Sequence, residues 1–178
     1  MKKRVWISIL AVVLLLCCGI GGTLAWLSVK TASVQNTFTV GDIDITLAET
    51  TGTTYKMVPG NTLTKDPKVT VKSGSEACWL FVKVEKSTNF DTFMNCTIAD
   101  GWTALTGVDG VYYRQVSATT ADTEFAVLKD NQVTVKEDVT KQQLQEVANS
   151  LPTMTFTAYA VQQDNIADAA KAWTKVTP

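Results

Sequence analysis

The stretch CWLFVKVE, residues 78–85, carries the clearest secondary-structure signal in this chain of 178 residues. One face of the stretch is entirely apolar, and the other begins with aromatic residues and ends with charged ones: Cys78, Leu80, Val82 and Val84 against Trp79, Phe81, Lys83 and Glu85. Alternation with a period of two is typical of a β-strand. A strand that is apolar on both faces is covered on both sides, so we expect it in the centre of a sheet.

Further strands are predicted on both sides of this one by the same alternation and by β-branched and aromatic content. They cover residues 37–40, 43–47, 68–72, 111–116, 124–128, 133–135 and 153–162, with turns at residues 58–61 and 107–110. Gly41 lies where the apolar face changes from even to odd positions, which predicts a bulge or turn. The strand at residues 153–162 is largely apolar or Thr on both faces and is predicted in the middle of a sheet.

Helices are few in the predicted fold. Thr140 followed by Gln143 forms a capping-box pattern, which predicts a short helix over residues 141–148. Asp164 or Asn165 is positioned to cap a last helix that carries Trp173 on its apolar face. Residues 87–104 have no period and are predicted to form an insertion loop with a short helix. The pattern predicts an all-β sandwich with two short helices, and the strand count alone leaves open an immunoglobulin-like or a jelly-roll connection.

The amino-terminal segment has the order of an export signal. Lys2, Lys3 and Arg4 precede a run without charge that ends at Leu27. We expect residues 1–25 to be a signal peptide cut between Ala25 and Trp26, because small side chains precede that bond. Two alternatives remain open. The run exceeds the roughly 20 residues that span a bilayer, which permits an uncleaved anchor, and Cys17 and Cys18 permit a lipoprotein.

Composition restricts the partners. The chain has 16 basic and 17 acidic residues, and loss of Lys2, Lys3 and Arg4 with the signal leaves 13 against 17, a net charge of −4. Nucleic-acid-binding domains have the opposite balance, so no nucleic-acid partner is expected. Residues 36–178 form one predicted domain, because no linker-like run of Gly, Ser or Pro divides them.

Several motifs together resemble the TasA/camelysin family of secreted bacterial proteins. They occur in the same order as in the family: Ala25-Trp26-Leu27, Asn36-Thr37-Phe38-Thr39-Val40-Gly41, Asp44-Ile45-Thr46-Leu47, Lys65-Asp66-Pro67-Lys68-Val69-Thr70-Val71, the strand at residues 78–85, and Ala158-Tyr159-Ala160-Val161-Gln162-Gln163 followed by Ala172-Trp173. The resemblance implies a jelly roll, processing by a SipW-type signal peptidase, and a protein of the cell surface or biofilm matrix of a Gram-positive-type bacterium. Camelysin-type relatives have been classed as metallopeptidases, so a peptidase is a formal alternative.

The residue types needed for hydrolytic chemistry are scarce. The chain has no histidine, which removes Ser-His and Cys-His nucleophile activation and the HExxH zinc site. The acidic pairs Asp42 with Asp44 and Asp164 with Asp168 do not follow a calcium-loop spacing. No glycine-rich loop follows a strand and opens a helix, as a nucleotide site requires. We therefore expect no catalytic residues, no bound metal and no cofactor.

The cysteines at positions 78 and 96 of the exported part are predicted to form a disulfide, because export delivers them to a compartment where such bonds persist. Closing a loop with 17 residues between the two would stabilise the domain by about 3 kcal/mol. The alternative is two free thiols, with Cys78 buried as a small hydrophobe on its strand and Cys96 in a loop.

Residues 26–35 form a predicted amino-terminal arm. Trp26, Leu27 and Val29 are apolar, but the following residues are polar and contribute little to a core. Such an arm is suited to add a strand to the open sheet edge of another copy, which would build fibres, with other matrix or cell-wall components as further partners. The alternative functions are a monomeric surface adhesion or ligand-binding module, with residues 87–104 as its loop, and the secreted peptidase.

Processing is the first testable prediction. The secreted protein is expected to begin at Trp26, because Ala25 is the last small residue after the apolar run. Amino-terminal sequencing of the extracellular material measures this directly. Recovery of intact Met1 in the membrane fraction would show that the segment is an anchor instead.

Overall fold

The computed structural model describes residues 41–52 and 54–176, all of which lie in one compact unit that spans Val40–Pro178. The strands in these residues are β1 Ile45–Ala48, β2 Thr62–Thr64, β3 Lys68–Val71, β4 Cys78–Lys86, β5 Met94–Ile98, β6 Thr103–Ala104, β7 Val111–Val116, β8 Thr123–Ala126, β9 Leu128–Val135 and β10 Met154–Gln162. The helices are α2 Phe90–Phe93, α3 Lys141–Glu146 and α4 Ala169–Val176. The predicted boundaries at residues 25 and 35 fall outside the described residues.

Strand β4 is central, as its sequence predicts. It lies between β10 and β7 in an antiparallel sheet with the order β10-β4-β7-β6. On one face Leu80 and Val82 are completely buried, and on the other Phe81 is completely buried. The predicted division of β4 into one apolar face and a second face that is apolar at its start and charged at its end is therefore confirmed.

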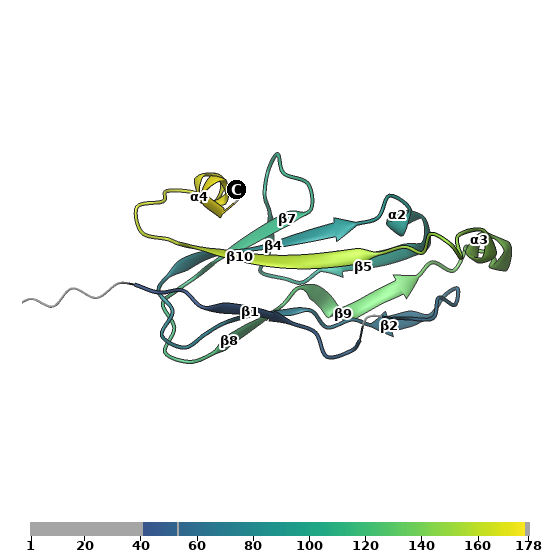
Figure 1. Cartoon of the computed structure of the whole chain (residues 1–178), viewed down its shortest axis with the longest axis horizontal. Coiled ribbons are helices and arrows are strands. Elements are labelled where there is room, and N and C mark those ends of the chain that lie inside the picture. The colour runs from purple at the N-terminus through teal and green to yellow at the C-terminus, as the bar shows by residue number, and fades with distance from the viewer. Residues whose placement is uncertain (1–40, 53, 177–178) are drawn as a thin grey trace, which may run out of the picture. The chain divides into compact units, whose positions relative to one another are not determined.

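The second layer consists of two three-stranded sheets, β1-β3-β8 and β2-β9-β5, all with antiparallel pairs. Figure 1 shows β1, β8, β9 and β2 in one layer and β10, β4 and β7 in the other. Val69 and Val71 of β3 pack against Leu80 and Val82 of β4 in a fully buried cluster between the layers. The predicted all-β sandwich is confirmed.

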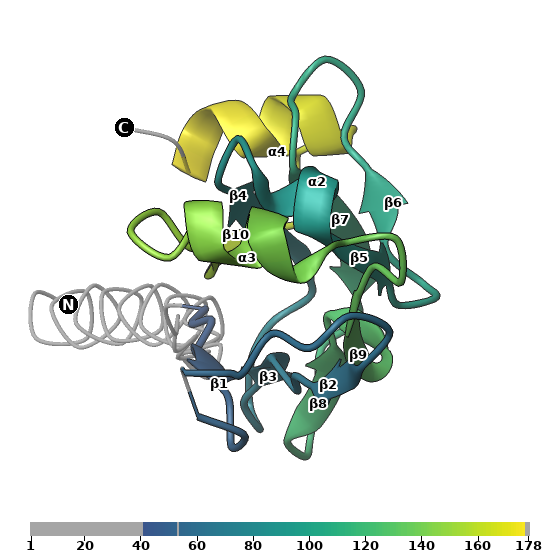
Figure 2. The same cartoon turned by 90° about the vertical axis from the view of Figure 1, so that its right-hand side faces the viewer.

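The outer face of β4 is covered by helix α4, which lies over the sheet in Figure 2. The Trp173 ring packs against Phe81 in a tilted arrangement and against Tyr159 edge to face, with ring centroids 5.2 and 5.4 Å apart. The predicted helix is present, but its cap differs from the prediction. Asp168 Oδ1 accepts a hydrogen bond from the Lys171 backbone N–H at 2.8 Å, so the helix begins later than Asp164 or Asn165 would allow. This bond also lowers the pKa of Asp168.

Helix α3 begins as predicted. The Thr140 side chain accepts a hydrogen bond from the Gln143 backbone, and the Gln143 side chain accepts one from the Thr140 backbone, which completes the capping box. The short helix predicted within residues 87–104 is present as α2. The rest of this segment is not a loop, because it contains β6 and strand β5, which pairs with β9 across a bulge between Cys96 and Ile98. With α2 the described residues hold three short helices rather than two.

The turn before β7 generates the second prediction. Gly110 has φ +71°, and a Cβ placed there would lie 2.5 Å from the Val84 carbonyl oxygen. Gly107 has φ +81° with nothing within 4 Å of such a Cβ. Gly107→Ala should therefore cost only the left-handed backbone penalty, about 1–2 kcal/mol. Gly110→Ala should cost about 1–3 kcal/mol more, because the strand backbone must shift.

Urea denaturation measures the free energy of unfolding of the two alanine variants and of the unsubstituted protein. Gly107→Ala is the matched control, because both changes impose the same backbone strain. Equal losses of unfolding free energy in the two variants would show that the close approach to Val84 has no energetic effect.

Candidate functional site

Strand β10 is an edge strand, which corrects the prediction that it lies in the middle of a sheet. It pairs with β4 along its whole length, from Met154 opposite Lys86 to Gln162 opposite Cys78. Among the described residues no strand pairs with its other side. The apolar character of both faces misled the prediction, because one face packs on the core and the other supports α4 through Tyr159. Those contacts do not require a second neighbouring strand.

The inner face of β10 is incompletely covered. Phe156 and Ala158 are half-buried, whereas Val84 and Val82, which lie directly opposite them on β4, are buried. Strand β1 approaches β10 but is not hydrogen-bonded to it. The unpaired backbone of β10 therefore adjoins apolar side chains that have solvent on one side.

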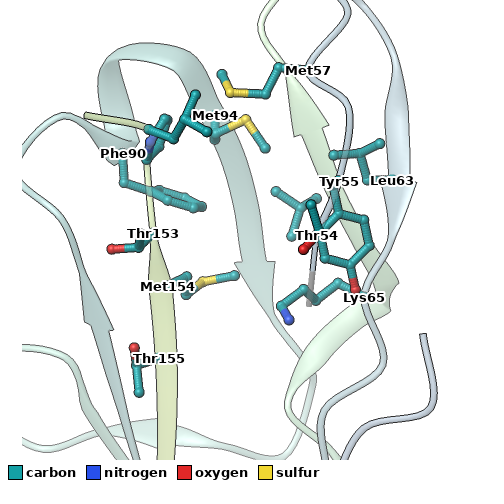
Figure 3. Close-up of a pocket in the computed structure, with 13 residues that line it drawn as sticks. Thr54, Tyr55, Met57, Leu63, Lys65, Phe90, Met94, Thr153, Met154 and Thr155 are labelled. Atoms are coloured by element: carbon teal, nitrogen blue, oxygen red, sulfur yellow. The ribbon is translucent and has the colours of Figure 1, made fainter. Parts of the chain in front are cut away.

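A pocket of about 460 Å³ opens where β10 begins. Figure 3 shows Thr153, Met154 and Thr155 on one wall and Tyr55, Leu63 and Lys65 facing them. Phe90, Met94, Val133, Met57, Thr54, Leu151 and Pro152 complete the lining. Three of the four methionines in the chain lie here, and methionine side chains adapt to apolar groups of differing shape.

A second hollow of about 280 Å³ continues along β10 and shares Lys65, Met154 and Thr155 with the first. It is lined in addition by residues of β1 and by Phe156, Pro67 and Glu49. We call the two hollows together the β10 groove. The groove runs beside the open strand edge and lies between the two layers of the sandwich.

Charge on the wall of the β10 groove is balanced within the protein. The Lys65 ammonium group forms an ion pair with Glu49, and it lies 5.3 Å from the centroid of the Tyr55 ring and 5.8 Å from that of Phe156. The Tyr55 hydroxyl donates to Gly52 O at 2.7 Å. Because Lys65 is already paired, the groove favours an apolar or neutral occupant over an anion.

The loop that bears Glu49 is held by Asp66. Its carboxylate accepts hydrogen bonds from the Thr50 hydroxyl at 2.5 Å and from the backbone N–H groups of Thr50 and Thr51 at 3.0 and 3.1 Å. These bonds, that from the Thr50 hydroxyl above all, lower the pKa of Asp66 from 3.8 to about 2. Asp66 belongs to the motif at residues 65–71 that resembles the TasA/camelysin family. In the structure its hydrogen bonds to Thr50 and Thr51 hold the loop beside the groove in place.

Cys78 and Cys96 are both free thiols, which differs from the predicted disulfide. Cys78 begins β4 opposite Gln162, whereas Cys96 Sγ lies 4.0 Å from Met154 Sδ at the opposite end of β10. Eight residue positions of strand, about 27 Å, separate these ends, and a disulfide needs Cα atoms no more than about 7 Å apart. Burial raises the pKa of the Cys78 thiol to about 11 and also raises that of Cys96.

The other predicted site residues, Ala25, Trp26, Leu27 and Val29, lie outside the described residues. Within residues 41–52 and 54–176 no group of three or more His, Cys, Asp or Glu side chains is arranged to hold a metal ion. The same residues contain no helix long and apolar enough to cross a membrane.

The geometry defines an all-β sandwich with an open strand edge beside an apolar groove. The family model of the camelysin metallo-endopeptidases matches residues 1–170, so the chain belongs to the camelysin family. This family is associated with the cell surface and the extracellular space. No curated protein matches the chain, and no solved structure does so either.

Sequence reasoning missed most of the groove. Lys65, Met57, Met94 and Met154 come from separate segments, and no local spacing connects them. Strand β2, Thr62–Thr64, which supplies Leu63 to the lining, was also missed, because it directly follows the predicted turn at residues 58–61 and only Leu63 in it is apolar.

A prediction about pH follows from Asp66. Its pKa is lower in the folded protein than in the unfolded chain, so its contribution to stability is present above about pH 4 and is lost as the pH falls toward 2. Asp66→Asn should lower stability at neutral pH and flatten the loss of stability between pH 4 and pH 2. Thermal unfolding at several pH values measures both effects.

Asp42→Asn provides the comparison, since the Asp42 carboxylate accepts one hydrogen bond, from the neighbouring Ile43 backbone N–H. An Asp66→Asn profile parallel to that of the unsubstituted protein over this interval would contradict the assignment.

Proposed function

We propose that this protein is a secreted structural component of the cell surface or extracellular matrix, and that it assembles into fibres. In each contact the arm, residues 26–35 of one copy, adds a strand to the β10 edge of the next copy. The observation that carries the proposal is the side of β10 with which no described strand pairs, beside the half-buried inner face of β10. Strand addition at such an edge supplies main-chain hydrogen bonds, and the neighbouring pockets supply side-chain specificity.

The β10 groove suits this occupant chemically. Its apolar lining and internally paired Lys65 match the uncharged, apolar side chains of Trp26, Leu27 and Val29. An arm that leaves its own domain and joins the next makes a head-to-tail contact, which propagates instead of closing into a dimer. Cleavage after Ala25 by a SipW-type signal peptidase releases the arm and starts assembly.

A monomeric ligand-binding module is the second candidate, because the pocket of about 460 Å³ has the size of a small-molecule site. Phe90 and Met94, from the segment predicted to be a binding loop, contribute to its lining. The camelysin family is also described as a family of metallo-endopeptidases. Peptidase activity with and without a chelator tests that function separately.

The assembly prediction is tested by deletion of residues 26–34. The shortened protein should fold and remain monomeric, whereas the mature chain that begins at Trp26 forms fibres visible by electron microscopy and sedimentation. A matched control keeps the length of the arm but replaces Trp26, Leu27 and Val29 with Ser. This control should weaken assembly if the side chains give specificity.

A synthetic peptide of residues 26–40, added in excess, should block fibre growth by occupying the β10 edge, and a scrambled peptide should not. If the shortened protein polymerises as the mature chain does, strand donation by the arm is wrong. A mature chain that stays monomeric but binds small apolar molecules would favour the ligand-binding module.

A further inference from the structure

Arg114 projects from β7 toward the interior of the sandwich. It pairs with Leu80 of β4, and paired residues on antiparallel strands share a face. Tyr112 and Val116, two positions to either side, pack in the cluster between the layers. A guanidinium group thus lies at the margin of an apolar core, and this partial burial lowers the pKa of Arg114.

The guanidinium group is held by aromatic rings. Its Cζ lies 4.0 Å from the centroid of the Phe125 ring and 5.3 Å from that of Trp102. Gly101 packs closely on it, since a Cβ at that position would lie 3.0 Å from an Arg114 Nη atom. Trp102 is fixed in turn, because its indole N–H donates to Ala126 O at 2.8 Å. These contacts fix the plane of the guanidinium group. They do not provide hydrogen-bond acceptors for its N–H groups.

Arg114 has no acceptor or counter-ion among the described residues. Its Nε atom is buried without a hydrogen-bond partner, and its Nη atoms form no hydrogen bond with any residue that the structure describes. All seven ion pairs of the described residues use lysine: Lys65, Lys68, Lys72, Lys83, Lys86, Lys129 and Lys171. The chain has only one other arginine, Arg4.

A partly buried, unpaired charge costs free energy that an apolar side chain in the same place would not. Arginine differs from lysine in its rigid fork of donors, which matches the two oxygens of a carboxylate. We propose that Arg114, whose guanidinium lies over the rings of Phe125 and Trp102, is a binding site for a carboxylate group. The group comes from a small free carboxylate or from an acidic side chain of a second copy of this chain, whose exported part has an excess of acidic residues.

This proposal does not depend on the arm or on β10. It is tested on the full chain in detergent, titrated with sodium acetate against sodium chloride at equal ionic strength. The indole N–H resonance of Trp102 reports occupancy. We expect a saturable acetate response, weakened at least about tenfold in Arg114→Lys, which keeps the charge without the fork, and abolished in Arg114→Met.

Lys129→Gln is the matched control, because Lys129 pairs with Asp100 beside Gly101 and its loss removes a nearby charge without touching the fork. Its acetate response should equal that of the unsubstituted chain. If the carboxylate belongs to a second copy, sedimentation should show concentration-dependent association that acetate competes away and that both Arg114 variants lose.

Circular dichroism establishes which variants are folded, and Arg114→Lys decides the outcome if Arg114→Met does not fold. The proposal is overturned if folded Arg114→Lys retains the full acetate response. It is also overturned if the unsubstituted chain shows neither an acetate response nor an association that depends on Arg114.

Discussion

The burial of β4 on both faces is the constraint on which the rest of the domain depends. Each large apolar side chain removed from water contributes about 1.5–3 kcal/mol, so both faces must be covered. The second layer covers Leu80 and Val82, and helix α4 covers Trp79 and Phe81. Helix α4 has only eight residues, so it shields the first half of the strand. The second half bears Lys83 and Glu85, which form an ion pair with each other.

Covering β4 in this way leaves β10 at the margin of its sheet. Protein surfaces usually blunt long open edges with charges, prolines or bulges, because an open edge pairs readily with other chains. Between Met154 and Gln162, β10 has none of these features: it contains no charged residue and no proline, and its register with β4 is unbroken. The β10 groove lies beside this edge. A bound segment would meet the backbone donors and acceptors of β10 and the apolar side chains of the groove together. The edge and the groove therefore lie side by side, which is the arrangement on which the proposed strand addition rests.

The features that sequence reasoning found are those that local signals specify. The two faces of β4, the strand at Val111–Val116 and the capping box of Thr140 are each encoded within about ten residues. Other features depend on pairings between distant segments. These are the edge position of β10, the separation of the two cysteines, and the part of the β10 groove lined by Met57, Met94 and Met154. The pattern of apolar residues along a strand also reports only whether its two faces are covered. It does not show whether the strand has a neighbouring strand on both sides or, like β10, on one side with a helix packed on its outer face.

The long pairing between β4 and β10 also governs the order in which the domain can fold. Met154 pairs with Lys86, 68 positions earlier, and Gln162 pairs with Cys78, 84 positions earlier. Closing loops of this length is entropically unfavourable before the contacts form, so such sheets fold slowly. During synthesis β4 has no β10 beside it until residues 154–162 have been made. Until then the edge of β4 that β10 covers has no partner strand, so the central sheet is completed late in folding.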